Sequence, residues 1–214
     1  MLESFVNFFV QRKKMKVLVC DVDSTLIHAY FDDISGKPGI WRSFPLNGQD
    51  IHICYRPYLL EFLHFADQHF DAVYIWSAGT YDYIEKIMWY ISQDFKKKYN
   101  YAWFPKLILS REECTYHPQQ FYYKPIKGLV ERMKSLGVTD FTEEEIGILD
   151  DNNYTFLENT NNGILIKPFT VDTIGYMNDN SLKKFQKWTE DHWTADSLVT
   201  EVIKSQKAKQ GQTA

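Results

Sequence analysis

Short apolar runs that alternate with amphipathic segments constrain the fold of this chain more than any other feature. The runs, at residues 16–20, 71–76, 146–149 and 163–166, are too short for helices and end in polar residues. Such runs are typical of strands buried on both faces, and their alternation with helices predicts a parallel sheet with helices on both sides. We therefore expect an α/β domain with a doubly wound parallel sheet.

Apolar residues at helical spacing predict the helices that cover this sheet. They lie at residues 58–69, 81–98 and 126–136, and the last of these helices is expected to end at Gly137. An alternating apolar pattern at 51–55 predicts one further strand.

Two stretches between these elements are expected to form insertions. Residues 28–49 are rich in glycine, proline and asparagine, which predicts an irregular loop or flap beside the site. Residues 105–109 and 121–123 predict two strands around a polar turn, that is, a small β-hairpin insertion. Neither insertion is large enough for a full cap domain.

The length and composition favour a single domain. The chain has 214 residues, 44% of them hydrophobic, which is enough for one substantial core. We expect this domain to cover residues 1–206, with its core at about 15–170 and one or two closing helices at 181–206. Residues 2–12 predict an amphipathic helix, with a membrane-surface or targeting helix as the alternative, and 207–214 is expected to be disordered.

Charge and cysteine content exclude several classes of protein. The net charge of −4 argues against a general nucleic-acid coat protein. Cys20, Cys54 and Cys114 lie far apart, which predicts buried thiols in a reducing compartment rather than a disulfide framework or a zinc site. No apolar run is long enough to span a membrane and no signal-peptide pattern is present, so we expect a cytoplasmic or nuclear protein without a membrane partner.

The first buried run ends in the sequence Asp-Val-Asp-Ser-Thr, which begins at Asp21. Asp21 and Asp23 are two residues apart in an extended segment, so they point the same way, and the following turn brings Thr25 toward them. One carboxylate can then act as a nucleophile and the other as a proton donor. The alternatives are a solvated turn or a calcium loop, but Leu26 stands where a calcium loop of the EF-hand type needs glycine.

Three later strand ends carry complementary chemistry. Ser77 and Ala78 begin a small-residue loop, Lys124 precedes a proline, and Asp150 and Asp151 follow the apolar run at 146–149. Each alone has an ordinary structural explanation, but right-handed crossovers would bring all four ends to one edge. There the hydroxyl and loop amides would cradle a phosphate, the lysine would supply a cation, and the acids would suit Mg²⁺.

This set of motifs resembles the haloacid dehalogenase superfamily of aspartate-nucleophile phosphatases over residues 15–170. Within that superfamily it is similar to the phosphatases of the RNA polymerase II carboxy-terminal domain, and most similar to the catalytic domain of the branch with a ubiquitin-like domain. The motifs that carry the resemblance are Arg56-Pro57-Tyr58, Trp76-Ser77-Ala78, Leu109-Ser110-Arg111-Glu112, Leu149-Asp150-Asp151 and the segment from Asn162 to Phe169.

The resemblance implies roles for the residues of the first motif. Asp21 would attack phosphorus and become an aspartyl phosphate. Asp23 would protonate the leaving oxygen and later deprotonate water. Thr25 would fix the nucleophile by a hydrogen bond, and Arg56 is a candidate for the substrate groove. One departure is Ser24, where relatives often carry a glutamate to which no chemistry is assigned.

The resemblance also implies a metal site. The Asp21 carboxylate, the Asp23 main-chain carbonyl and Asp151 would hold Mg²⁺, while Asp150 would orient the cluster. The division of roles between the two adjacent acids is left open.

The spacing of the motifs indicates an open site. Only 51 residues separate Thr25 from Ser77 and 46 separate Ser77 from Lys124, which leaves no room for the cap that excludes water in enzymes acting on small metabolites. The favoured function is a Mg²⁺-dependent phosphoserine/phosphothreonine protein phosphatase acting on a phosphorylated protein, with the RNA polymerase II repeats as one candidate. The alternatives are a nucleic-acid 3′-end phosphatase, which the acidic charge disfavours, and an inactive adaptor; the phosphosite and oligomeric state are left open.

Overall fold

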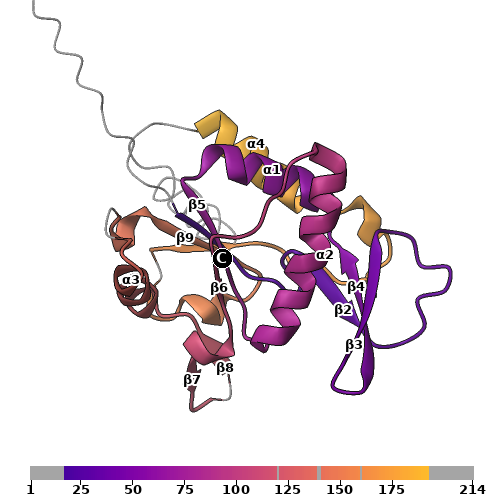
Figure 1. Ribbon diagram of the computed structural model, residues 1–214, viewed down its shortest axis with the longest axis horizontal. Coiled ribbons are helices and arrows are strands. Elements are labelled where there is room, and N and C mark those ends of the chain that lie inside the picture. The colour runs from indigo at the N-terminus through magenta and orange to yellow at the C-terminus, as the bar shows by residue number, and fades with distance from the viewer. Residues whose placement is uncertain (1–16, 120, 139–140, 160, 193–214) are drawn as a thin grey trace, which may run out of the picture.

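The computed structural model describes residues 17–119, 121–138, 141–159 and 161–192 (Figure 1). The expected helix at 2–12, the part of the closing segment beyond residue 192 and the tail at 207–214 lie outside these residues. Within the described part of the chain, no helix is long and apolar enough to cross a membrane.

The centre of the molecule is a five-stranded sheet in which every neighbouring pair of strands is parallel. The chain leaves the central strand β1 toward one edge of the sheet and later returns to its other side. The strand order is β10-β9-β1-β5-β6, made by Gly163–Leu165, Ile146–Asp150, Val17–Cys20, Ala72–Trp76 and Leu107–Leu109. The order reverses between β1 and β9, and ligands in such sheets bind outside the carboxyl ends of the strands at this point.

Alternation of side chains along β1 builds a core on each face of the sheet. Val17 and Val19 pack on one side and Leu18 and Cys20 on the other, and all four are fully buried. Within the described residues, three helices contribute to the core on the Leu18 side and one to the core on the Val17 side. Figure 1 shows the two groups on opposite faces of the sheet. The three are α1 (Leu59–His69), α2 (Tyr81–Tyr99) and α4 (Ser181–His192), and the one is α3 (Ile126–Ser135). The predicted doubly wound sheet and helices are confirmed.

A second, antiparallel sheet occupies the region expected to be an irregular flap. Its strands β2 (Ile27–Tyr30), β3 (Trp41–Leu46) and β4 (Gln49–Tyr55) pair in the order β2-β4-β3. The prediction of an irregular loop was therefore wrong for residues 28–30 and 41–46, while residues 31–40 contain no helix or strand. The reason is the turn at Asn47 and Gly48, whose φ angles of 52° and 78° make a two-residue hairpin.

The insertion before Lys124 is a hairpin, but not of the two strands expected. Residues 107–109 form β6 and join the central sheet, whereas β8 (Phe121–Tyr123) pairs with β7 (Thr115–His117). Lys124 therefore follows a hairpin strand and not, as expected, a strand of the central sheet.

Short 3₁₀ helices connect several of these elements. They are η1 (Arg111–Glu113), η2 (Glu143–Glu145), η3 (Asn153–Phe156) and η4 (Tyr176–Asn178).

Candidate functional site

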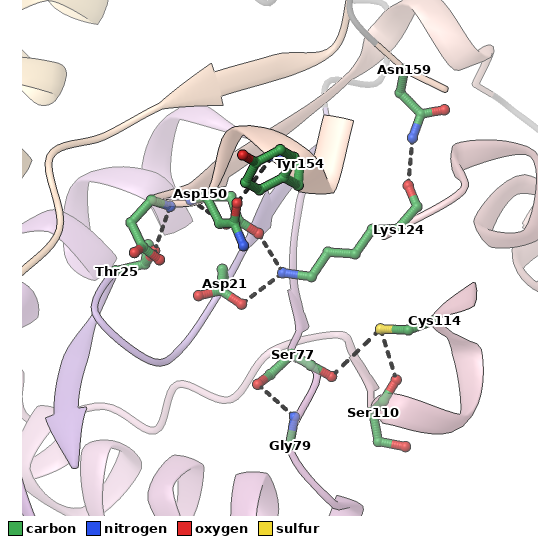
Figure 2. Close-up of polar contacts among 12 residues, drawn as sticks. Asp21, Thr25, Ser77, Gly79, Ser110, Cys114, Lys124, Asp150, Tyr154 and Asn159 are labelled. Atoms are coloured by element: carbon green, nitrogen blue, oxygen red, sulfur yellow. Dashed lines mark hydrogen bonds and ion pairs between the residues drawn. The ribbon is translucent and has the colours of Figure 1, made fainter. Parts of the chain in front are cut away.

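A lysine and two acids meet at the carboxyl end of the central sheet. Asp21 directly follows β1, and Asp150 is the last residue of the neighbouring strand β9. The Lys124 ammonium donates to Asp21 Oδ1 and Asp150 Oδ2 (Figure 2), and both distances are 2.6 Å. Asp21 is 8% exposed, Asp150 2% and Lys124 3%. Solvent therefore screens these contacts very little.

An asparagine that the sequence patterns do not mark holds the backbone on the carboxyl side of Lys124. The Asn159 side-chain amide donates to the Lys124 carbonyl (Figure 2). Its oxygen accepts from the Ile126 amide at 3.3 Å. On the other side of the peptide, the Lys124 amide donates to the Thr155 carbonyl at 3.3 Å. These contacts aim the lysine at the sheet edge although it does not come from a strand of that sheet. No local pattern identifies Asn159 as a partner of this backbone.

Burial and the neighbouring charges shift the pKa values of both Asp21 and Lys124. Burial raises the pKa of Asp21 and the nearby Asp150 raises it further, while Lys124 acts in the opposite direction and the net pKa stays well above the usual range. Burial alone would lower the pKa of Lys124, but the two carboxylates outweigh it and raise that pKa. The lysine is therefore a fixed cation.

The acidic residues form a group that suits a hard metal ion. One carboxylate oxygen from each of Asp21, Asp150 and Asp151 lies within 4.8 Å of the others. Burial, and after it the charge of Asp150, raises the pKa of Asp151 to about 6. Carboxylate oxygens gathered in one place are the donors that Mg²⁺ prefers in proteins. The contribution of the Asp23 main-chain carbonyl stays a prediction.

The Asp23 side chain is held by a tyrosine. The Tyr83 hydroxyl donates to Asp23 Oδ1 at 2.5 Å. Burial raises the pKa of Asp23, and the hydrogen bonds from Tyr83 and Ser77 lower it by less. A carboxyl group with a raised pKa is suited to donate a proton. Helical spacing places Tyr83 only on the apolar face of its helix, and no partner could be assigned to its hydroxyl from that spacing.

The loop from Ser77 to Gly79 lies between β5 and α2, and its role as a phosphate cradle stays a prediction. Ser77 is 2% exposed, and its hydroxyl accepts from the Gly79 amide at 3.0 Å (Figure 2). The Ala78 carbonyl accepts from Arg111 Nε at 2.6 Å, which ties the loop to the 3₁₀ helix η1. Cys114 Sγ also contacts the Ser77 carbonyl at 3.9 Å. The pKa of this thiol is raised to about 11, mainly by burial. The thiol is thus a neutral neighbour of the loop.

Thr25 has a different partner from the one expected. Its hydroxyl donates to Asp151 Oδ1 at 3.2 Å and accepts from the Asp151 amide at 3.1 Å. Thr25 therefore joins the first acidic motif to the last and orients Asp151, instead of fixing Asp21 as the resemblance implied. The turn that makes this possible begins at Ser24, whose φ of 58° is in the left-handed region.

Arg56, expected to line a substrate groove, is a buried structural residue. It is 1% exposed and forms a bidentate ion pair with Asp179, in which Nε lies 2.9 Å from Oδ1 and Nη2 lies 3.0 Å from Oδ2. It also donates to the carbonyls of Thr25 at 3.0 Å and Lys167 at 2.6 Å. Because all three of its nitrogens are engaged, Arg56 pins the loop after β1 to the segment before α4 and offers nothing to a substrate.

A parallel sheet with paired acids, a buried lysine and a serine loop at its carboxyl edge defines a haloacid dehalogenase-like domain. Residues 16–198 match the family described as NLI interacting factor-like phosphatase, and the chain belongs to this family. This confirms the resemblance that the motifs indicated.

Relatives and solved structures agree with this assignment. Ubiquitin-like domain-containing CTD phosphatase 1 of Xenopus tropicalis is 32% identical over 193 residues, which are 87% of this chain and 52% of the relative. The human protein of the same name is 31% identical over 194 residues, 88% of this chain and 53% of the relative. The chain thus spans about half the length of these curated relatives.

The fold is similar to that of two solved structures of Fcp1. Fission yeast RNA polymerase II CTD phosphatase Fcp1 bound to beryllium fluoride has a TM-score of 0.55 at 19% identity, covering 95% of this chain and 57% of that one. A second structure, of Fcp1 described as an essential RNA polymerase II CTD phosphatase, has a TM-score of 0.56 at 20% identity, covering 91% and 63%. At this identity the likeness concerns the fold alone.

Proposed function

We propose that this chain is a Mg²⁺-dependent phosphoserine/phosphothreonine protein phosphatase that acts through an aspartyl phosphate. The observation that carries the proposal is the buried Lys124 ammonium at 2.6 Å from both Asp21 and Asp150, beside a separately held Asp23. The relatives that share its family are named as phosphatases of the RNA polymerase II carboxy-terminal domain, which makes those phosphorylated repeats the first candidate substrate.

The first chemical step would be attack of an Asp21 carboxylate oxygen on phosphorus. The bond between phosphorus and the serine or threonine oxygen breaks as the new bond forms, and Asp23 gives its proton to the leaving oxygen. Lys124 and the amides after Ser77 would neutralise charge on the phosphoryl oxygens in the transition state. The products of this step are the free hydroxyl of the protein and an aspartyl phosphate.

The second step would be hydrolysis of that aspartyl phosphate. Asp23, now ionised, takes a proton from a water molecule, which attacks phosphorus and breaks the bond to Asp21. Inorganic phosphate leaves, Asp21 regains its carboxylate and Asp23 its proton. Asp21, Asp150 and Asp151 would hold Mg²⁺, which supplies positive charge where a phosphate dianion meets several carboxylates.

The test compares two variants on two substrates. Asp21→Asn leaves no carboxylate to attack phosphorus, so it should be inactive on a phosphoserine peptide and on an activated aryl phosphate. Asp23→Asn should lose far more kcat/KM on the peptide, because its serine alkoxide needs a proton and the phenolate does not. Far-ultraviolet circular dichroism and thermal unfolding check that both variants are folded.

Three results would count against the proposal. Turnover of Asp21→Asn above a mock-purified control would remove the aspartyl phosphate. Activity of the parent on a 3′-phosphorylated oligonucleotide, and not on the peptide, would favour a nucleic-acid end phosphatase. A parent protein inactive on all three substrates in the presence of Mg²⁺ would favour an adaptor.

A further inference from the structure

Tyr83 contacts the proposed general acid, but none of the proposed chemical steps uses it. It is the third residue of α2, so its hydroxyl reaches the site from the helix that follows the serine loop. That hydroxyl donates to Asp23 Oδ1 at 2.5 Å. The contact occupies one oxygen of the carboxyl group that would protonate the leaving group.

The ring of Tyr83 lies close to two neighbours. One is the serine loop: a Cβ added at Gly79 would stand 2.8 Å from Tyr83 Cδ1, so only glycine leaves room for the ring here. The other is Phe44 of β3, with ring centroids 6.4 Å apart. Phe44 is 4% exposed and also stacks on Tyr90, which comes from the same helix. The hydroxyl is therefore placed by packing and not by the hydrogen bond alone.

A tyrosine hydroxyl in this place has a specific effect on a carboxylic acid. Because Oδ1 of Asp23 accepts the hydrogen bond from Tyr83, the other oxygen, Oδ2, is the favoured place for a proton on Asp23. The same bond prevents free rotation of the carboxyl group about its χ2 angle. The proton is thus presented in one direction, and a general acid is effective only within hydrogen-bond reach of the atom that it protonates.

We propose that Tyr83 is a positioning residue for the general acid: it holds Asp23 so that the proton-bearing oxygen faces the leaving group. This inference rests on the proposed function. It also assigns a task to the antiparallel sheet, since Phe44 of β3 buttresses the tyrosine ring and so connects this sheet to the proton donor.

The decisive variant is Tyr83→Phe, which deletes the hydroxyl and keeps the ring that packs on Gly79 and Phe44. On a phosphoserine peptide, kcat/KM should fall about 10-fold to 100-fold, a part of the typical contribution of general acid catalysis. On an activated aryl phosphate it should fall less than about 3-fold, because phenolate departs with little protonation. The ratio kcat/KM is the right quantity because it contains only the steps up to formation of the aspartyl phosphate.

Tyr90→Phe is the matched control. Tyr90 lies on the same helix and also packs on Phe44, but its hydroxyl donates to the Ser43 carbonyl at 3.1 Å, away from the acids. This variant should keep kcat/KM within about 2-fold on both substrates, as expected for an exposed hydrogen bond outside the site.

A double variant tests whether Tyr83 acts through Asp23. In an Asp23→Asn background, Tyr83→Phe should cause no further loss on the peptide, because residues that act as a unit are not additive. Losses that multiply, or a Tyr83→Phe loss of equal size on both substrates, would show a merely structural role and overturn the inference. So would a Tyr83→Phe protein with the activity of the parent.

Failure of the inference can be told apart from failure of the proposed function. In the first case the parent protein turns over both phosphate esters and Asp21→Asn does not, while Tyr83→Phe lacks the difference between substrates. In the second case the parent turns over neither ester, and both proposals fall together. Thermal unfolding of Tyr83→Phe and Tyr90→Phe within about 3 °C of the parent confirms that the comparison is made on folded protein.

Discussion

Replacement of Lys124 by methionine is the most informative single change, because it acts on rate and stability through the same two contacts. Methionine keeps most of the aliphatic stem and removes the ammonium group that lies 2.6 Å from Asp21 and 2.6 Å from Asp150. Both acids are buried, so water cannot take over the role of the lysine.

The rate should fall by about two to three orders of magnitude in kcat, the usual cost of one well-placed contact to transition-state charge. Stability should fall as well. Breaking a buried ion pair leaves an uncompensated charge, which costs about 3–5 kcal/mol in the free energy of unfolding. Added Mg²⁺ should recover part of this loss, since a cation bound by the three acids stabilises only the folded state.

The loss of stability should also depend on pH, with a sign that follows from Asp21. The pKa of Asp21 is already raised in the folded protein, and Lys124 opposes that rise. Without the lysine the pKa rises further. A group whose pKa is raised on folding loses its stabilising contribution as the pH increases through the folded value. The deficit of the variant should therefore be larger at about pH 7.5 than at about pH 5.

The assay is urea unfolding at both pH values, with and without Mg²⁺, beside kcat on a phosphoserine peptide. Lys127→Met is the control, because Lys127 is an exposed lysine three residues along in α3. It should leave kcat and stability unchanged. A Lys124→Met protein within about 2-fold of the parent in kcat and within about 1 kcal/mol in stability, as for a surface ion pair, would refute the reasoning.

The other predictions concern the metal and two residues that hold the site together. An excess of EDTA should abolish turnover and Mg²⁺ should restore it; full activity in EDTA would remove the metal from the mechanism. Asp179→Asn should lower the free energy of unfolding by about 1.5–3 kcal/mol because it weakens charged hydrogen bonds to the buried Arg56. The pKa of Asp179 is lowered in the folded protein despite burial, chiefly by Arg56, so this difference from the parent should shrink as the pH falls through that pKa. Asn159→Ala should reduce kcat more than about 10-fold by releasing the backbone of Lys124, and a value within about 2-fold of the parent would mean that the lysine is placed without it.

The sequence by itself determined the central sheet, its helices and the main acids of the site. Each of these depends on local information: an apolar run of strand length, helical spacing, or two acids two residues apart at the end of a strand. Asp21 and Asp150 lie together because β1 and β9 are neighbouring parallel strands whose ends meet at one edge. Topology rules of this kind need only the order of strands and helices along the chain.

Only the tertiary structure decided which partner each polar side chain takes. Thr25 bonds to Asp151 and Arg56 to Asp179, pairs that are 126 and 123 residues apart in the chain. Tyr83 reaches Asp23 from another element, 60 residues away. Periodicity assigns a residue to a face of its own helix or strand. It does not say which residue of another element its hydroxyl or guanidinium group will contact. Contacts between distant segments depend on how the elements pack together, and that is a property of the assembled fold.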